Sequence, residues 1–430
     1  MNTSGRKSTS GDNCAPVRRG VTAAAACIAM GLSLAVPATS LESLAANSHQ
    51  DSGLMRAGGS MEPAGSRVSA AAATGDGLVH YGGGAVVTGR PRVYLVFWGS
   101  AWGTEVVNAQ GDLTFSSDFY FGAPKLQEMF KGLGTGGETW SGVMTQYCEW
   151  VAVGATSCPN TAPHVGYPTG GALAGTWYDN RPVAIDATRD DIAAEAYNAA
   201  ANHFGDFSPA AQYFILSPTR SKAGGFNVSP SSDCAWHWYV NKPAGPAFTS
   251  LPYIMDIAGS GCDTGAVNGP GPAGELDGYT MIASHEYAET ITDLQPTTGW
   301  DDPAVNPGEV ADKCTPEQAW LLGQAGGRNV TTATGTFALA AIWSNDTNRC
   351  DTAHRILASP VPSLIGDTLA QTGQALNAAY LVLGAKSYKV DCNNIGLVTA
   401  QSPAPGTQVA YGTPVSITIG TKPAAPTVCP

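Results

Sequence analysis

Residues 277–293, which read DGYTMIASHEYAETITD, place one histidine and several carboxylates inside an otherwise apolar stretch. The apolar side chains recur at helical spacing and Asp277 is a suitable N-cap, so we expect a helix here. Residues four apart lie one above the other on a helix, which puts His285 and Glu289 on the same face. Glu286 lies about 100° further round the axis. The fold must therefore either leave these carboxylates in solvent or place groups or ions beside them that offset their charge.

Two ligands one helical turn apart, with a glutamate beside them, form the arrangement of a zincin helix. In the common form of this motif both ligands are histidines, whereas here the second is Glu289. We predict that His285 and Glu289 bind a metal ion and that Glu286 acts as the general base. The alternative interpretation is a solvated acidic helix, which has the same short pattern.

A second acidic segment, residues 308–314 (GEVADKC), provides candidates for a third ligand. Glu309 follows Glu289 by 20 residues, which is the separation found in gluzincin metalloproteases, so we predict that Glu309 completes the site. Asp312 is expected to hydrogen-bond His285 and orient its ring. Cys314 could also bind zinc, but in an oxidising compartment we expect it to form a disulfide.

His237 is the remaining candidate for the third ligand. It lies in the aromatic segment CAWHWY, residues 234–239, which suits the wall of a cleft better than a ligand position. We therefore expect His237 to stabilise an oxyanion. Tyr279 and Tyr287 of the predicted helix are weaker candidates for that role.

Three segments resemble the secreted exordium / phosphate-induced protein family and its bacterial relatives. They are YGGGAVVTGRPRVYLVFWG (residues 81–99), CAWHWY, and HEYAETITD followed by GW and GEVADKC. The resemblance covers residues 78–355. Plant members of the family are linked to cell-wall growth, so the resemblance implies an extracellular setting, while the metal site is inferred from residue spacing alone.

Strands and helices alternate ahead of the helix at residues 277–293. Residues 92–98 and 212–216 are continuous apolar runs that predict buried strands. Helices are expected at residues 124–131, with proline in the first turn, and from Thr188, with a capping box. We predict an α+β main domain over residues 78–358, layered and zincin-like.

Residues 361–430 differ in sequence character from the residues before them and resemble a PASTA domain. The segment VPSLIG leads into a helix expected at residues 367–381, and two strands with a Pro/Gly turn between them follow within residues 396–419. This predicts a separate small α+β module. PASTA modules elsewhere are linked to peptidoglycan, so the resemblance implies contact with the cell wall.

The N-terminus has the features of a signal peptide over residues 1–40. Arg18 and Arg19 close a basic region, and residues 20–36 are apolar but too short to span a bilayer. Both general secretion and twin-arginine export fit this leader. Residues 41–77 are rich in Ser, Gly and Ala and are expected to form a flexible linker. We predict a secreted protein, free or associated with the cell wall, with no transmembrane segment.

Eight of the ten cysteines follow the leader, and an even number in an exported chain predicts disulfides. Structural zinc is the alternative, but no C-x-x-C motif supports it. Pairing of neighbours in sequence predicts the bonds Cys148–Cys158, Cys234–Cys262, Cys314–Cys350 and Cys392–Cys429.

The formal net charge is −12, and because the leader is basic, the rest of the chain carries about −15. This acidic balance disfavours nucleic acids and anionic membranes as partners. Two functions remain. The first is a secreted metal-dependent hydrolase, a zinc metallopeptidase acting on a peptide or protein, for which Mn²⁺ or Ca²⁺ would also suit a carboxylate-rich site. The second is a non-catalytic extracellular protein that binds wall carbohydrate or another protein.

Overall fold

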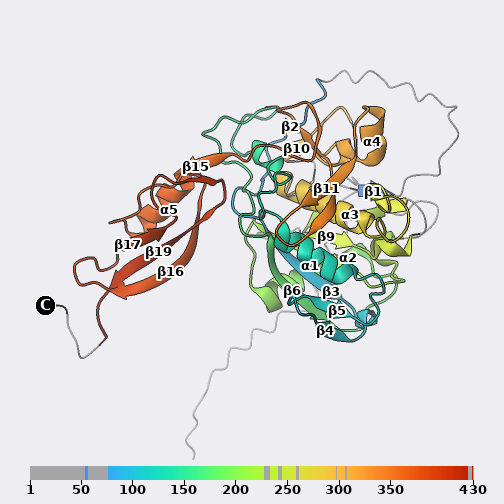
Figure 1. Cartoon of the computed structure of the whole chain (residues 1–430), viewed down its shortest axis with the longest axis horizontal. Coiled ribbons are helices and arrows are strands. Elements are labelled where there is room, and N and C mark those ends of the chain that lie inside the picture. The colour runs from blue at the N-terminus through green and yellow to red at the C-terminus, as the bar shows by residue number, and fades with distance from the viewer. Residues whose placement is uncertain are drawn as a thin grey trace, which may run out of the picture. The chain divides into compact units, whose positions relative to one another are not determined.

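The computed structural model describes residues 54–56 (backbone only), 76–226, 233–240, 245–257, 261–296, 298–305, 308–424 and 429. The predicted leader and most of the predicted linker lie outside these residues. Within the described part of the chain, no helix combines the length and apolar character needed to cross a membrane. The main domain and the C-terminal module are described separately below (Figure 1).

The main domain is built on a six-stranded sheet with the strand order β1-β8-β9-β7-β3-β6. The strands β6, β3, β7 and β9 run parallel to one another, whereas β8 is antiparallel to β9 and β1 is antiparallel to β8. Leu95 of β3 pairs with Thr176 of β6 and Phe214 of β7. The strands are β1 (Leu54–Arg56), β3 (Arg92–Trp98), β6 (Leu173–Asp179), β7 (Ala211–Leu216), β8 (Asp233–Tyr239) and β9 (Ala247–Leu251).

Both faces of the sheet are buried at β3 and β7, which explains why these two strands are almost continuously apolar. Leu95 and Phe214 pack with α1 (Gly122–Gly132) and α3 (Asp277–Thr292) on one face. Val96 and Ile215, which alternate with them, pack on the other face with α2 (Arg189–Asn198) and the π-helix Ala199–Phe204. The strands predicted at residues 92–98 and 212–216 and the mixed α and β architecture are confirmed. The zincin-like assignment stays a prediction.

Of the three helix starts predicted for the main domain, two follow the local sequence signals and one departs from them. Thr188 and Asp191 form the expected capping box of α2, and Pro124 lies in the first turn of α1. The prediction that Asp277 caps α3 is wrong. Asp277 is inside the helix, and its carboxylate instead accepts the backbone N–H groups of Val267 and Asn268.

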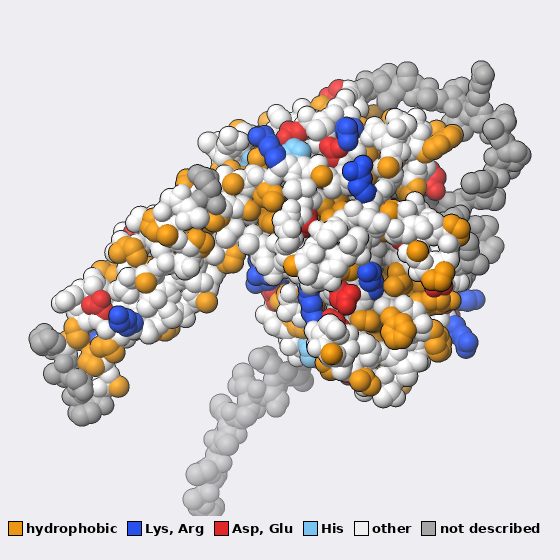
Figure 2. Space-filling view, in the orientation of Figure 1, with side chains coloured by type: hydrophobic (Ala, Val, Ile, Leu, Met, Phe, Trp, Pro, Cys, Tyr) orange, Lys and Arg blue, Asp and Glu red, His pale blue; other side chains and the backbone are white. Residues whose placement is uncertain are grey.

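Smaller elements complete the main domain. The paired strands are β2 (His80–Tyr81) with β10 (Trp300–Asp301), β4 (Glu105–Val107) with β5 (Leu113–Phe115), β11 (Gly327–Thr331) with β12 (Thr336–Ala340), and β13 (Ile342–Ser344) with β14 (Arg349–Asp351). The short helices are α4 (Pro316–Leu321) and the 3-10 turns Ser100–Trp102, Met144–Gln146, Ala223–Gly225, Ile254–Asp256, Gly261–Asp263 and Asp312–Cys314. On the face that Figure 2 shows, Lys and Arg side chains are dispersed among neutral and hydrophobic ones.

The C-terminal module has a hydrophobic core of its own, formed by residues that include Leu364, Leu376 and Ile417. Its main sheet has the order β16-β19-β17, with β16 parallel and β17 antiparallel to β19. The predicted helix was too long and the strand β16 was missed, because the helix ends at Ala378 and the chain turns at Tyr380 with a positive φ. The elements are β15 (Ala358–Pro360), α5 (Leu369–Ala378), β16 (Val382–Val390), β17 (Val398–Ser402), β18 (Gln408–Ala410) and β19 (Pro414–Thr421).

Four disulfide bonds are present, and the predicted pairing is confirmed for each of them. They join Cys148 to Cys158, Cys234 to Cys262, Cys314 to Cys350 and Cys392 to Cys429. Three lie in the main domain and the last closes the C-terminal module. Bonds of this number are typical of proteins in an oxidising compartment.

Candidate metal centre

Two imidazoles and four carboxylates meet in the interior of the main domain. Three of the six residues come from α3, one from β8, and two from the segment that precedes α4. All six side chains are buried, and none is more than 3% exposed. The residues are His285, Glu286 and Glu289 of α3, His237 of β8, and Glu309 and Asp312.

The first group forms around His285. Its Nε2 lies 3.0 Å from Oε1 of Glu289 and 3.4 Å from Oδ1 of Asp312. The backbone N–H of Asp312 donates a hydrogen bond to the same Oε1 of Glu289 at 3.0 Å. These three side chains each offer one ligand atom within 4.8 Å of the others, so they could hold a metal ion.

The second group forms around His237. Its Nδ1 lies 3.2 Å from Oε2 of Glu286 and 3.5 Å from Oε2 of Glu289. Its Nε2 lies 3.5 Å from Oε1 of Glu309. His237, Glu286 and Glu289 also offer ligand atoms within 4.8 Å of one another. Glu289 therefore belongs to both groups and presents a different oxygen to each imidazole.

Strand alternation explains why His237 reaches α3. Trp236 and Trp238 pack with the core on the α2 side of the sheet. Successive side chains of a strand point to opposite faces, so His237, which lies between these tryptophans, points to the α3 side. The aromatic neighbours thus direct the histidine inward.

The segment that carries Glu309 and Asp312 is held in place by several contacts. Glu309 forms an isolated β-bridge with Asp301, and the carbonyl of Val310 accepts the backbone N–H of Trp343. Two residues after Asp312, Cys314 is joined to Cys350. These contacts fix both acidic side chains against α3.

Many polar atoms of the centre have no hydrogen-bond partner among the described residues. They are Nε2 of His237, both ring nitrogens of His285, Oε1 of Glu286, Oε2 of Glu289, and both carboxylate oxygens of Glu309 and Asp312. Leaving charged groups buried and unpaired costs several kcal/mol for each group. Ligand atoms that surround one ion at about 2.0–2.2 Å lie roughly 3.3 Å from each other, close to the separations seen here. The residues present therefore fit a divalent cation.

The carboxylates and imidazoles strongly perturb one another. Burial raises the pKa of Glu286 and of Asp312 to about 7, and raises that of Glu309 well above its ordinary value. Burial alone would lower the pKa of both histidines. The neighbouring carboxylates outweigh this effect, so that the pKa of His237 and of His285 lies well above the ordinary value. The negative potential of the carboxylates thus attracts cations, whether protons or metal ions.

The structure places the predicted site residues together, but distributes them differently from the prediction. Asp312 contacts His285, as expected. Glu309, predicted from its spacing to share a metal ion with His285, faces His237 instead. The rings of Tyr279 and Tyr287 pack against Tyr253 and Trp140, respectively, in the hydrophobic core.

Two buried polar residues beside the centre were not predicted from the sequence. Asp293 follows Glu289 by one helical turn, and its Oδ1 accepts the backbone N–H of Gly299 at 2.7 Å. Gln212 of β7 donates hydrogen bonds from Nε2 to Thr249 at 2.8 Å and to Thr290 at 2.7 Å. The four-residue spacing from His285 through Glu289 was a signal for Asp293, whereas nothing local marked Gln212.

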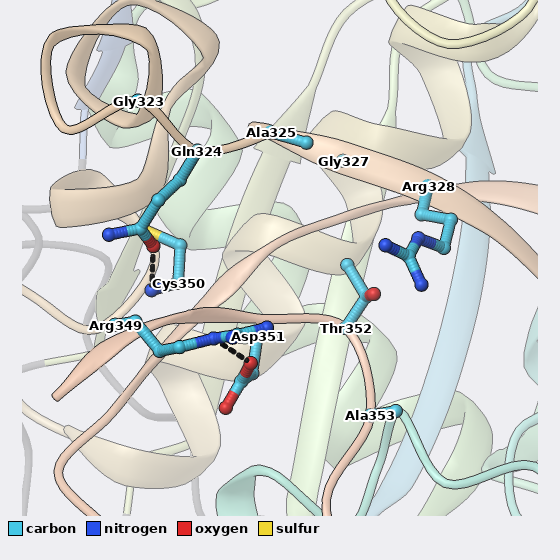
Figure 3. Close-up of a pocket in the computed structure, with 10 residues that line it drawn as sticks. All are labelled: Gly323, Gln324, Ala325, Gly327, Arg328, Arg349, Cys350, Asp351, Thr352 and Ala353. Carbon is cyan, nitrogen blue, oxygen red and sulfur yellow. Dashed lines mark hydrogen bonds and ion pairs between the residues drawn. The ribbon is translucent and has the colours of Figure 1, made fainter. Parts of the chain in front are cut away.

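A surface pocket of about 430 Å³ is lined by residues between 323 and 353, and none of the six residues of the centre lines it (Figure 3). Two arginines, Arg328 and Arg349, lie at this pocket, and Arg349 donates to Oδ1 of Asp351 at 2.7 Å. Cys350, another lining residue, is bonded to Cys314. This pocket and the charged centre are therefore different places.

The C-terminal module has a recognisable family. Residues 359–421 match the PASTA domain. The PASTA match covers nearly all of the module with the separate core and does not extend to residues 78–355, whose resemblance to the exordium / phosphate-induced family stays a prediction. No curated protein matches the chain. The PASTA match and the four disulfides point to an extracellular or cell-wall setting.

Proposed function

We propose that the chain is an extracellular metal-dependent hydrolase that acts on a peptide or protein. His285 and Glu289 of α3 would hold the cation, Zn²⁺ or else Mn²⁺ or Ca²⁺. Asp312 is the third ligand that the contacts favour, and Glu309 is the one that the spacing predicts. The observation that carries the proposal is a set of six buried ionisable side chains with unpartnered ligand atoms.

A divalent cation bound there would polarise a carbonyl group and lower the pKa of a bound water toward neutrality. Glu286 is the residue proposed to take a proton from that water. Its Oε2 is hydrogen-bonded to Nδ1 of His237, while its Oε1 has no partner among the described residues. Glu309 faces the other ring nitrogen of His237 and would stabilise a positive charge on that ring. That positive charge would stabilise a developing oxyanion through its electric field, because both ring nitrogens of His237 already face carboxylates.

The test begins with the metal content of the purified protein, followed by hydrolysis of casein and of peptides with and without a chelator. Glu286→Gln should abolish hydrolysis, because the amide cannot accept the proton, and should leave the cation of His285 in place. Metal-free wild-type protein, or hydrolysis that a chelator leaves unchanged, would contradict the proposal.

A second candidate function is an extracellular wall-binding protein in which the cation only stabilises the fold. Two observations favour it, the burial of the whole centre and the PASTA match. PASTA domains bind peptidoglycan or other cell-wall material, so we propose that residues 359–421 attach the protein to the wall. A metal-bound wild type that hydrolyses nothing under broad screening, but sediments with purified peptidoglycan, would favour this function.

A further inference from the structure

The centre consists of two ligand groups that share one carboxylate. Oε1 of Glu289 lies 3.0 Å from Nε2 of His285, and Oε2 of the same side chain lies 3.5 Å from Nδ1 of His237. Each group separately brings its ligand atoms within 4.8 Å of one another. A carboxylate placed in this way can bridge two cations, and catalytic two-metal sites hold their ions about 3.5–4 Å apart.

Unpartnered atoms occur on both sides of Glu289. Both ring nitrogens of His285 lack a hydrogen bond in spite of the short contact to Glu289, so that contact is not aligned as a hydrogen bond. On the other side, Oε1 of Glu286 and Nε2 of His237 are also unpartnered and buried. Ligand atoms that face a shared ion, and not each other, would have this geometry.

The charge of the centre also calls for more than one divalent cation. Glu286, Glu289, Glu309 and Asp312 are four carboxylates, and in the described part of the chain their ion pairs are with histidines. The adjacent Lys313 pairs with Asp302 instead. When both imidazoles are neutral, as metal ligands must be, a single divalent cation offsets half of four ionised carboxylates, and a second one would offset the remainder.

We propose that a second divalent cation, Mn²⁺ or Zn²⁺, binds to Nδ1 of His237, Glu286 and Glu289. One imidazole with carboxylates suits either ion. This site should be the weaker of the two, because it shares Glu289 and its ion is repelled by the first ion. The inference rests on the proposed function for the first cation. It adds regulation, since the second ion occupies Glu286 and His237 and so prevents Glu286 from accepting a proton. Excess metal should therefore inhibit hydrolysis.

The test is a titration of the metal-depleted full chain with Mn²⁺, in which binding is monitored by calorimetry and by electron paramagnetic resonance. Two binding steps and two ions per chain are expected, and the second step should convert the spectrum of an isolated Mn²⁺ ion into that of a coupled pair. His237→Gln and Glu286→Gln should each remove the weaker step and keep the tighter one. The loss of affinity for the second ion should exceed the roughly 10- to 100-fold effect that is expected of a residue that contacts a ligand and not the ion itself. His80→Gln, a change at a partly exposed histidine outside the centre, should keep both steps.

A single binding step in the wild type would overturn the proposal of a second site and leave the proposed function standing. No metal binding at all would overturn both the second site and the proposed function. Two coupled ions in His237→Gln would also overturn the assignment of the second site. Disulfide mapping and circular dichroism establish that each variant is folded. If a variant fails to fold, the ion count and the coupled spectrum of the wild type decide.

Discussion

At the scale of single residues, Glu289 organises the charged centre. Its Oε1 accepts the backbone N–H of Asp312 and contacts His285, and its Oε2 faces His237. The ligand roles of the surrounding carboxylates depend on which imidazole each one faces. Asp312 faces His285 and Glu309 faces His237, so these two acids should respond differently to mutation.

We expect Asp312→Ala to remove the tighter cation almost completely, because it deletes an oxygen that lies 3.4 Å from Nε2 of His285. Glu309→Ala should keep the tighter cation and weaken only the second one, about 10- to 100-fold, since Glu309 would act through the ring of His237. Metal occupancy of both variants at matched free Zn²⁺ measures the difference. The reverse order would show that Glu309 is the ligand, as its spacing from Glu289 predicts.

At the scale of elements, α2 is joined to the sheet by a buried carboxylate. Arg181 pairs with Glu195 of α2 at 2.7 Å and with Asp179 at the end of β6. Burial, with a further contribution from Asp179, raises the pKa of Glu195 to about 8. A carboxyl group with a raised pKa in the folded state binds its proton more tightly than it does in the unfolded chain.

This shift predicts a pH dependence of stability. The contribution of Glu195 to the free energy of unfolding is complete below its ordinary pKa of about 4.5 and is lost as the pH rises toward about 8. Glu195→Gln should therefore flatten the fall of the melting temperature between pH 5 and pH 8. An unchanged pH profile in this variant would show that another group is responsible.

The capping boxes offer a comparison between two helices. Thr188 caps α2 with Asp191, and Thr368 caps α5 with Gln371. Thr188→Ala should lower the stability of the main domain by about 1 kcal/mol. All ten tryptophans lie in residues 98–343, so tryptophan fluorescence during urea unfolding reports on that domain alone. Thr368→Ala should leave this transition unchanged, and a shift equal to that of Thr188→Ala would contradict the separation of the two cores.

At the scale of the whole molecule, the hydrophobic cores of the main domain are separate from the core of the C-terminal module. The module that matches the PASTA domain has its own core and the disulfide Cys392–Cys429. The strand β15 pairs with β18 and therefore belongs to the module. A boundary at residue 357 keeps all of these contacts together.

Truncation after Leu357 should thus leave a folded main domain with the metal content of the full chain. The reason is that removal of β15 together with the module leaves both hydrophobic cores of the main domain intact and removes only the core of the module. The melting temperature followed by tryptophan fluorescence and the metal content provide the measurement. Aggregation or loss of metal on truncation would show that the module supports the main domain.

The sequence by itself determined the features that depend on neighbouring residues. These include the apolar strand β3, the capping box at Thr188, and the helix that carries His285 and Glu289. Spacing along one helix, or apolar character along one strand, is a local property and can be read without the fold.

Only the tertiary structure decided which groups meet across elements. His237 reaches Glu286 because β8 lies antiparallel to β9 and points the histidine to the α3 side, while Asp312 reaches His285 because the backbone of its segment binds Glu289. A count of 20 residues from Glu289 to Glu309 does not specify this geometry, since a chain of that length can return to α3 in many ways. Packing of the sheet against α3 selects one of them, and that choice places Glu309 beside His237.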